Sequence, residues 1–290
     1  MKKSKSRIVF QVFNYTFLIA YALCAVLPLV HLGAISLSKT TYAEAGLVGL
    51  WPKGFNFESY SYIFANGDFF KAFGNSILRL ITGVPLNMIM VFLLAYPLSR
   101  PEAKFKGRSV YSWILMVSLL FTGGTVPMYM LVSALQLNNT LFALILPGAV
   151  PVFNVVLMMN FFRAIPEELH EAATIDGASE LKIMTLIYVP LSLPSVMTLA
   201  LFCIVAQWNS WMDGVLYMNT IDKMPLQAYL QSVVINTMEG NLDNVLDTNF
   251  VSQDTIDAAR LFLAIIPVIV FYFPLQKYFV KGLTLGGVKG

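Results

Sequence analysis

The chain has 290 residues, of which 57% are hydrophobic and only 12% are charged. Because a soluble domain usually contains about a quarter charged residues, this composition excludes an ordinary water-soluble domain. The net charge of +3 gives no indication of a nucleic-acid partner. The sequence therefore predicts an all-α membrane protein, since a backbone in lipid must satisfy its own hydrogen bonds.

Six apolar segments are each long enough to cross a bilayer, for which about 20 apolar residues are needed. The first follows a short basic N-terminus and contains no cleavage site, which predicts an uncleaved span. Residues 109–162 contain no charged side chain and are too long for one crossing, so the polar residues 136–139 are expected to separate two spans. The predicted spans, all within one transmembrane domain of residues 1–290, are 13–36, 73–98, 109–135, 140–162, 185–212 and 257–279.

Lysine and arginine predict the orientation of these spans, because basic residues concentrate on the cytoplasmic side. Most of them fall in segments that are cytoplasmic if the N-terminus is, so both termini are predicted to be cytoplasmic. Arg79 lies near the edge of a span and is expected to snorkel. The long outer loop, 213–256, is acidic and contains an apolar helical stretch. We interpret it as a structured docking element, with a solvated acidic loop as the alternative.

The cytoplasmic segment 163–182 reads RAIPEELHEAATIDGASELK and has the pattern of two short helices joined by a turn. Pro166 suits the first turn of a helix, and the acidic residues that follow it complement the helix dipole. Gly177 can adopt the positive φ that ends a helix, and a second helix is predicted to begin near Ala178. A helix that only lies on the membrane surface is the alternative.

The same segment resembles the EAA signature of the permeases of importer-type ABC transporters, whose usual form is E-A-A-x3-G-x9-I-x-L-P. The spacing is complete here, with one mild departure, Val189 in place of leucine. The matching residues are Glu171, Ala172, Ala173, Asp176, Gly177, Ala178, Ile187 and Pro190. The resemblance implies a type I ABC importer permease fold with a cytoplasmic coupling helix.

Two further segments resemble the carbohydrate branch of these permeases. Residues 276–290 are similar to the tail of the smaller permease of maltose-type sugar importers, and residues 207–211 are similar to a tryptophan–asparagine motif of the same branch. Together with residues 96–100, which follow span two, the resemblance extends over essentially the whole chain. It implies a binding-protein-dependent carbohydrate importer in the plasma membrane of a bacterium.

The resemblance also implies partners and contacts. A second homologous permease, two ATPase subunits and an extracytoplasmic solute-binding protein would complete the importer, with a sugar or oligosaccharide as cargo. In such permeases the coupling helix sits in a groove of the ATPase. Glu171 is therefore expected to contact the ATPase through its carboxylate, while the small Ala172 and Ala173 allow close packing. Gly286 and Gly287 are expected to approach the ATPase, where only glycine tolerates tight backbone contact.

No catalytic, cofactor or metal site is predicted in this chain. The phosphate-binding pattern G-x4-G-K-[ST] is absent from the sequence, so ATP and Mg are expected on the partner ATPase. Cys24 and Cys203 lack metal-ligand spacing and are interpreted as packed thiols. The predicted spans hold no acid well inside them, which argues against a proton-coupled secondary transporter.

Five residues inside spans or at their ends could line a substrate pathway. Buried amides also join helices to one another, and each amide in the set is explained at least as well in that way. The five residues are Asn87, Asn154, Gln207, Trp208 and Asn209. A permease for a non-sugar solute, and a channel or scaffold without an ATPase, remain the alternative functions.

Overall fold

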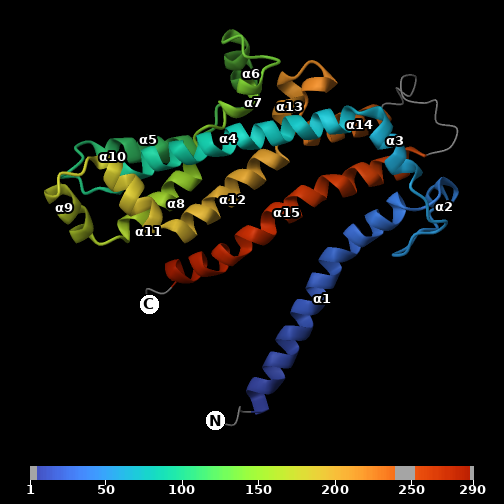
Figure 1. Cartoon of the computed structure of the whole chain (residues 1–290), viewed down its shortest axis with the longest axis horizontal. Helices are drawn as coiled ribbons and strands as arrows, with labels where there is room; N and C mark the ends of the chain where they lie inside the picture. Colours follow the sequence, from blue (N-terminus) through green and yellow to red (C-terminus); the bar gives the residue numbers. More distant parts are fainter. Residues whose placement is uncertain (1–4, 239–251, 288–290) are drawn as a thin grey trace. The chain divides into compact units, whose positions relative to one another are not determined.

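The structure is a computed structural model that describes residues 5–238 and 252–287 (Figure 1). These residues form helices and turns, and no strand occurs among them. Three helices are long and apolar enough to cross a membrane: α1 (Lys5–Ser36), α4 (Asp68–Ser99) and α15 (Gln253–Gly287). Two pairs of sharply bent helices raise the number of candidate spans to five.

The chain divides into two compact units, each of which is described by itself. The first unit comprises residues 1–69 and 234–266. It contains α1, whose apolar side chains are largely exposed, and the short helices α2 (Thr40–Glu44) and α3 (Glu58–Asn66). Gly33 near the end of α1 lets Phe262 of α15 approach, because a Cβ at this glycine would lie 2.9 Å from the phenyl ring.

The second unit comprises residues 70–233 and 267–290, and α4 runs through its centre. One face of α4 packs against α8 (Val152–Arg163), against α12 (Leu193–Asn209) and against the segment that precedes α12. The core that these helices share consists of Met88, Val91, Ala95, Tyr96, Val155, Met158, Phe162, Ile183, Met184, Tyr188, Val196, Leu199 and Cys203. Burial of this apolar surface holds the unit together.

Two bends shape the second unit. The axis turns by 112° between α5 (Arg108–Leu120) and α6 (Thr125–Ala134), where Gly124 has a φ of 85°. It turns by 89° before α12, after α10 (Glu180–Ile183), the π-helical segment η1 (Met184–Tyr188) and α11 (Val189–Leu191). Pro190 and Pro194 explain this bend, since neither offers an N–H to the preceding turn.

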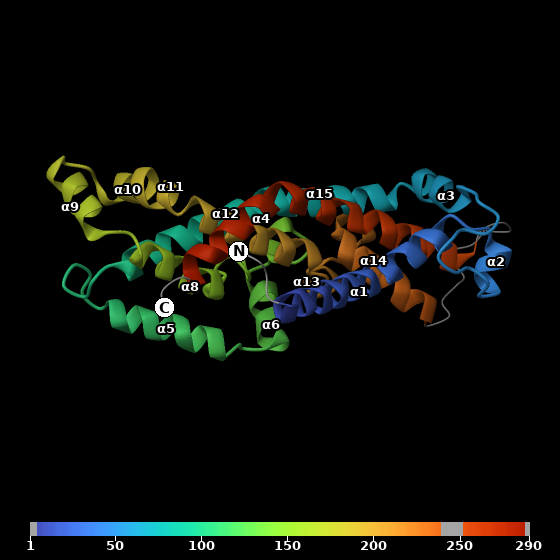
Figure 2. The same ribbon diagram turned by 90° about the horizontal axis from the view of Figure 1, so that it is seen from below.

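Short elements complete the second unit (Figure 2). They are α7 (Leu141–Ile145), α9 (Glu167–Ile175), α13 (Met212–Tyr217), the 3-10 helix η2 (Ile221–Lys223) and the first part of α14 (Leu226–Met238). Residues 136–139 form a turn between α6 and α7 in which Gln136 and Asn139 both have a positive φ. Part of the predicted outer loop, 239–251, lies outside the described residues.

Candidate functional site

The helix α9 ends in a turn that fixes the direction of the following helix. Gly177 has a φ of 77°, as its place in the sequence predicts. Its N–H donates to the carbonyl of Thr174 (3.0 Å), and the N–H of Ala178 donates to the carbonyl of Ala173 (3.0 Å). These two bonds are those of a Schellman cap, which satisfies the last carbonyls of a helix. Ala173 and Ala178 both pack against the core, so the cap is anchored to the unit.

A buried histidine joins α9 to α10 and α4. His170 is buried, and its Nε2 lies 3.3 Å from the Glu180 carboxylate. The Tyr96 hydroxyl donates to the same carboxylate oxygen at 2.5 Å. Tyr96 also packs edge-on against Tyr188, so the end of α4 is tied to both arms of the turn.

An ion-pair cluster holds α9 to the loop after α4. The Lys104 ammonium lies 2.6 Å from the Glu167 carboxylate and 3.5 Å from that of Glu171. The hydrogen bond from Lys104 lowers the pKa of the Glu167 carboxyl, and the same bond raises the pKa of the Lys104 ammonium. Glu171 remains largely exposed, with 61% of its side chain accessible.

The face of α9 that points away from the buried His170 is exposed. Leu169 and Ile175 present apolar side chains to the surroundings, and Ile175 is 86% exposed. Ala172 and Asp176 are also exposed, next to Glu171. An exposed face of this kind, apolar with an acidic edge on a rigidly capped helix, is suited to packing against another protein.

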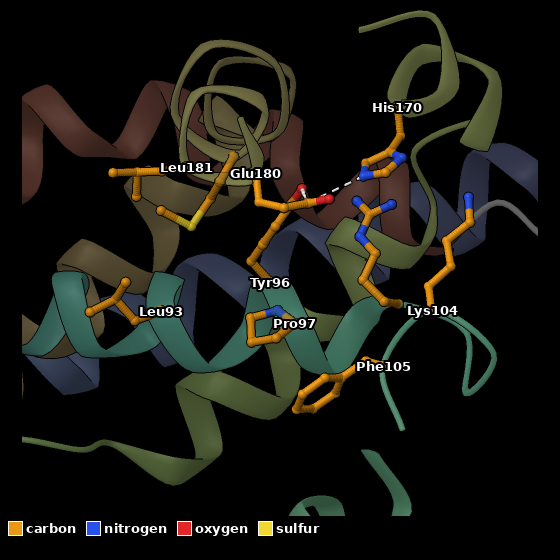
Figure 3. Close-up of a pocket in the computed structure, with 10 residues that line it drawn as sticks. Leu93, Tyr96, Pro97, Lys104, Phe105, His170, Glu180 and Leu181 are labelled. Carbon is orange, nitrogen blue, oxygen red and sulfur yellow. Dashed lines mark hydrogen bonds and ion pairs between the residues drawn. The ribbon is translucent and has the colours of Figure 1, made fainter. Parts of the chain in front are cut away.

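A cavity of about 340 Å³ lies between the end of α4 and the turn that joins α9 to α10 (Figure 3). One part of its wall is polar, and the remainder is apolar. The polar wall consists of Tyr96, Arg100, Lys104, His170 and Glu180, and the apolar wall of Leu93, Pro97, Phe105, Leu181 and Met184.

A second polar cluster lies further along α4. Arg79 is 3% exposed and forms an ion pair with Asp213, so the expectation that Arg79 snorkels is wrong. The guanidinium also donates to Gln207 Oε1 at 2.8 Å and to the Leu144 carbonyl at 3.2 Å. Because these partners satisfy the N–H donors of the guanidinium inside the protein, Arg79 can be buried. Arg79 and Asp213 are 134 residues apart in the sequence, and no sequence motif predicts that they form a pair.

The same cluster contains two of the predicted pathway residues. Gln207 Nε2 donates to Asn87 Oδ1 at 2.9 Å, and Asn87 Nδ2 donates to the carbonyls of Gly148 (2.7 Å) and Ala149 (3.0 Å). Gly83 makes room for Gln207, since a Cβ there would lie 3.0 Å from Gln207 Nε2. Asn87 and Gln207 are buried and connect helices.

The remaining pathway residues lie apart from that cluster. Asn154 and Trp208 line a cavity of about 620 Å³ whose walls come from α8, α12 and residues 268–272 of α15 and are mostly apolar. Asn154 is buried and donates to Cys203 Sγ at 3.2 Å, while Trp208 is 2% exposed and stacks edge-on against Phe73. Asn209 is exposed at the end of α12.

The predicted ATPase-contacting glycines, Gly286 and Gly287, form the end of α15. They belong to the second unit, as does the turn at Gly177 that joins α9 to α10. Among residues 5–238 and 252–287, no three His, Cys, Asp or Glu side chains lie close enough to hold a metal ion.

Comparison with known proteins places this geometry in a family context. Residues 61–284 match the family described as "Binding-protein-dependent transport system inner membrane component". The chain is 36% identical to the polygalacturonan/rhamnogalacturonan transport system permease protein YtcP of Bacillus subtilis, over 97% of this chain and 98% of that protein. It is 34% identical to the protein LplC of the same organism, over 100% and 98% of the two chains.

A solved structure resembles the whole chain. It is the crystal structure of a bacterial ABC transporter involved in the import of the acidic polysaccharide alginate, and the matched chain is 31% identical. The match has a TM-score of 0.85 and covers 96% of this chain and 99% of the other. The overall helical arrangement is therefore shared with a chain of a solved ABC transporter.

Proposed function

Because the chain belongs to the family of binding-protein-dependent transport system inner membrane components, we propose that it forms half of the pore of an ATP-driven sugar importer. Members of this family are non-catalytic membrane subunits, and a separate subunit hydrolyses ATP. A second, homologous permease supplies the other half of the pore. Two ATPase subunits, which hold ATP and Mg, and an extracytoplasmic binding protein complete the assembly.

The proposed topology has six spans with both termini in the cytoplasm. Five of the spans correspond to α1, α4, α15 and the two bent pairs. The sixth combines α7 with α8, a shorter apolar helix. The distribution of lysine and arginine supports this orientation, which sets α9 on the cytoplasmic side.

We propose that α9 is the element through which ATP hydrolysis moves the pore. The observation that carries this proposal is the capped turn at Gly177, which fixes α9 to α10 while leaving one face of α9 exposed. The ATPase contact would involve Glu171, Ala172, Ala173, Asp176, Gly177 and Ala178. Because α9, η1 and α4 share a core, a displacement of α9 is transmitted to the pore helices. Gly286 and Gly287 would contact the ATPase from the tail.

The cargo is proposed to be an oligosaccharide. YtcP is named as a polygalacturonan/rhamnogalacturonan permease, and the structural relative is described as an alginate importer. Two other relatives are named as permeases for maltodextrin and for melibiose, raffinose and stachyose. The pathway proposal divides into two groups of residues. Asn154 and Trp208 are kept as path residues because they line the cavity of about 620 Å³, and Asn209 because it is exposed. Asn87 and Gln207 line no such cavity and act by holding the helices together through their amides.

The experiment is sugar uptake by proteoliposomes that contain the assembled importer and its binding protein. ATP inside the vesicle is expected to drive accumulation of the oligosaccharide that the binding protein captures, and omission of the binding protein is expected to abolish it. Accumulation of a non-sugar solute in place of sugar would contradict the cargo assignment. Solute flux that is independent of ATP would instead indicate a channel.

A further inference from the structure

Arg100 is a buried cation that forms no ion pair within 4 Å among the described residues, although Glu167 and Glu180 lie close enough to interact with its charge. It is 8% exposed, and its Nε and Nη2 have no hydrogen-bond partner. The guanidinium carbon lies 4.4 Å from the ring centre of Tyr188 and 4.8 Å from that of Tyr96. Stacking on two rings attracts the charge but satisfies none of these N–H donors, so the site is incomplete without an acceptor.

The carboxylates around Arg100 are engaged by other groups. Glu180 is the one acid that lines the cavity, and it accepts from Tyr96 at 2.5 Å and lies 3.3 Å from His170. The nearby acids of α9 pair with Lys104 instead. An acceptor for Arg100 must therefore come from beyond the residues that the structure describes or from a rearrangement of Glu180.

The cavity is amphipathic, which indicates the kind of acceptor. Beside the basic residues it has an apolar wall whose rim includes Leu93 (48% exposed) and Leu181 (62% exposed). Leu93 lies on α4 and precedes Arg100, which directly follows the end of this helix, by seven residues, or about 10 Å along the helix axis. A charged group at Arg100 and an apolar chain along Leu93 would thus occupy one continuous site.

We propose that this cavity binds the phosphate of an anionic phospholipid of the cytoplasmic leaflet. Arg100 contacts the phosphate oxygens, Lys104 offers its third N–H beside its pairs with Glu167 and Glu171, and an acyl chain covers Leu93 and Leu181. Basic pockets beside membrane helices suit such headgroups, and charge-assisted bonds to phosphate are strong. The location in the cytoplasmic leaflet rests on the proposed topology. The bound lipid would bridge α4 to the coupling turn.

The test measures lipid retained by the purified, assembled importer, using native mass spectrometry after delipidation and addition of defined lipid. Phosphatidylglycerol is expected to bind, and phosphatidylcholine is expected to bind about tenfold more weakly, since net negative charge is what the basic wall selects. Arg100→Gln is expected to weaken phosphatidylglycerol binding about tenfold, the loss of a charge-assisted contact. Lys106→Gln is the matched control, because Lys106 is exposed in the same loop and does not line the cavity.

Equal retention of phosphatidylglycerol by the wild type and by Arg100→Gln would overturn the proposal. So would equal retention of the two lipids, or displacement of phosphatidylglycerol by an equal concentration of inorganic phosphate, which would indicate a soluble ligand. If Arg100→Gln fails to assemble, Lys104→Gln tests the polar wall of the same cavity and Leu93→Glu tests its apolar wall. Normal retention of phosphatidylglycerol by both variants would also overturn the proposal. Sugar uptake by the same preparations tests the transport function separately.

Discussion

Arg79 on α4 and Asp213 on α13 form an ion pair across 134 residues of sequence. The pair is two-pronged, because Nη1 donates to Oδ1 at 3.1 Å while Nη2 contacts Oδ2. The Arg79 side chain is 4% exposed and that of Asp213 is 21% exposed. The pair therefore fixes α4 to the junction of α12 and α13 in a largely dry environment.

Asp213→Asn is expected to lower the stability of the assembled importer by about 2–4 kcal/mol, since it leaves a buried guanidinium without its counterion. The control is Asp222→Asn, which breaks an exposed pair with Lys71, whose side chains are 57% and 66% accessible. That change should cost about 0–1 kcal/mol. Thermal unfolding of the purified complex compares the two variants, and equal shifts would show that the Arg79 pair is not a buried structural element.

Two glycines on α4 differ in their surroundings and give a matched pair. Gly83→Ala places a Cβ 3.0 Å from Gln207 Nε2, and Gln207 cannot yield because Arg79 and Asn87 hold both ends of its amide. We expect the free energy of unfolding to fall by about 1–2 kcal/mol, because the hydrogen bonds of Gln207 are disturbed. Gly74→Ala meets nothing within 4 Å and should stabilise the helix by up to about 1 kcal/mol. The unfolding midpoints of the two variants should therefore move in opposite directions, and a shift of the same sign in both would refute the assigned role of Gly83.

Gly177 is expected to tolerate asparagine better than alanine. A Cβ at this position meets nothing within 4 Å, so the penalty comes from the φ of 77° rather than from a clash. For alanine this penalty is about 1–2 kcal/mol, whereas asparagine visits the left-handed region more readily. ATP-driven uptake should fall in the order Gly, Asn, Ala, Pro. Full uptake by Gly177→Pro would mean that the capped turn has no part in coupling.

The sequence predicts local features of this fold well because their causes are local. Gly177 ends α9 since only a residue that accepts a positive φ fits a Schellman cap. The polar segment 136–139 separates α6 from α7, because Gln136 and Asn139 adopt a positive φ that a continuous helix does not allow. Pro190 and Pro194 predict an interrupted helix, although nothing in the sequence predicts an 89° bend, which depends on how the flanking helices pack.

The polar cluster around Arg79 could not be predicted, because its members are far apart in the chain. A lone arginine near the end of an apolar run most simply snorkels, and only the folded chain brings Asp213 and the Leu144 carbonyl to it. The sequence does not distinguish a structural role from a pathway role for Asn87 and Gln207 for the same reason. Their mutual hydrogen bond becomes visible once α4 and α12 are packed together.

Site-specific photocross-linking tests the proposed contact between α9 and the ATPase. A benzophenone amino acid replaces Ile175, which is 86% exposed on α9, or Trp51, which is 82% exposed between the first two predicted spans. After irradiation of the assembled importer in membranes, we expect an adduct with the ATPase subunit from position 175 and none from position 51. Absence of an ATPase adduct at position 175, or equal adducts at both positions, would contradict the proposed contact.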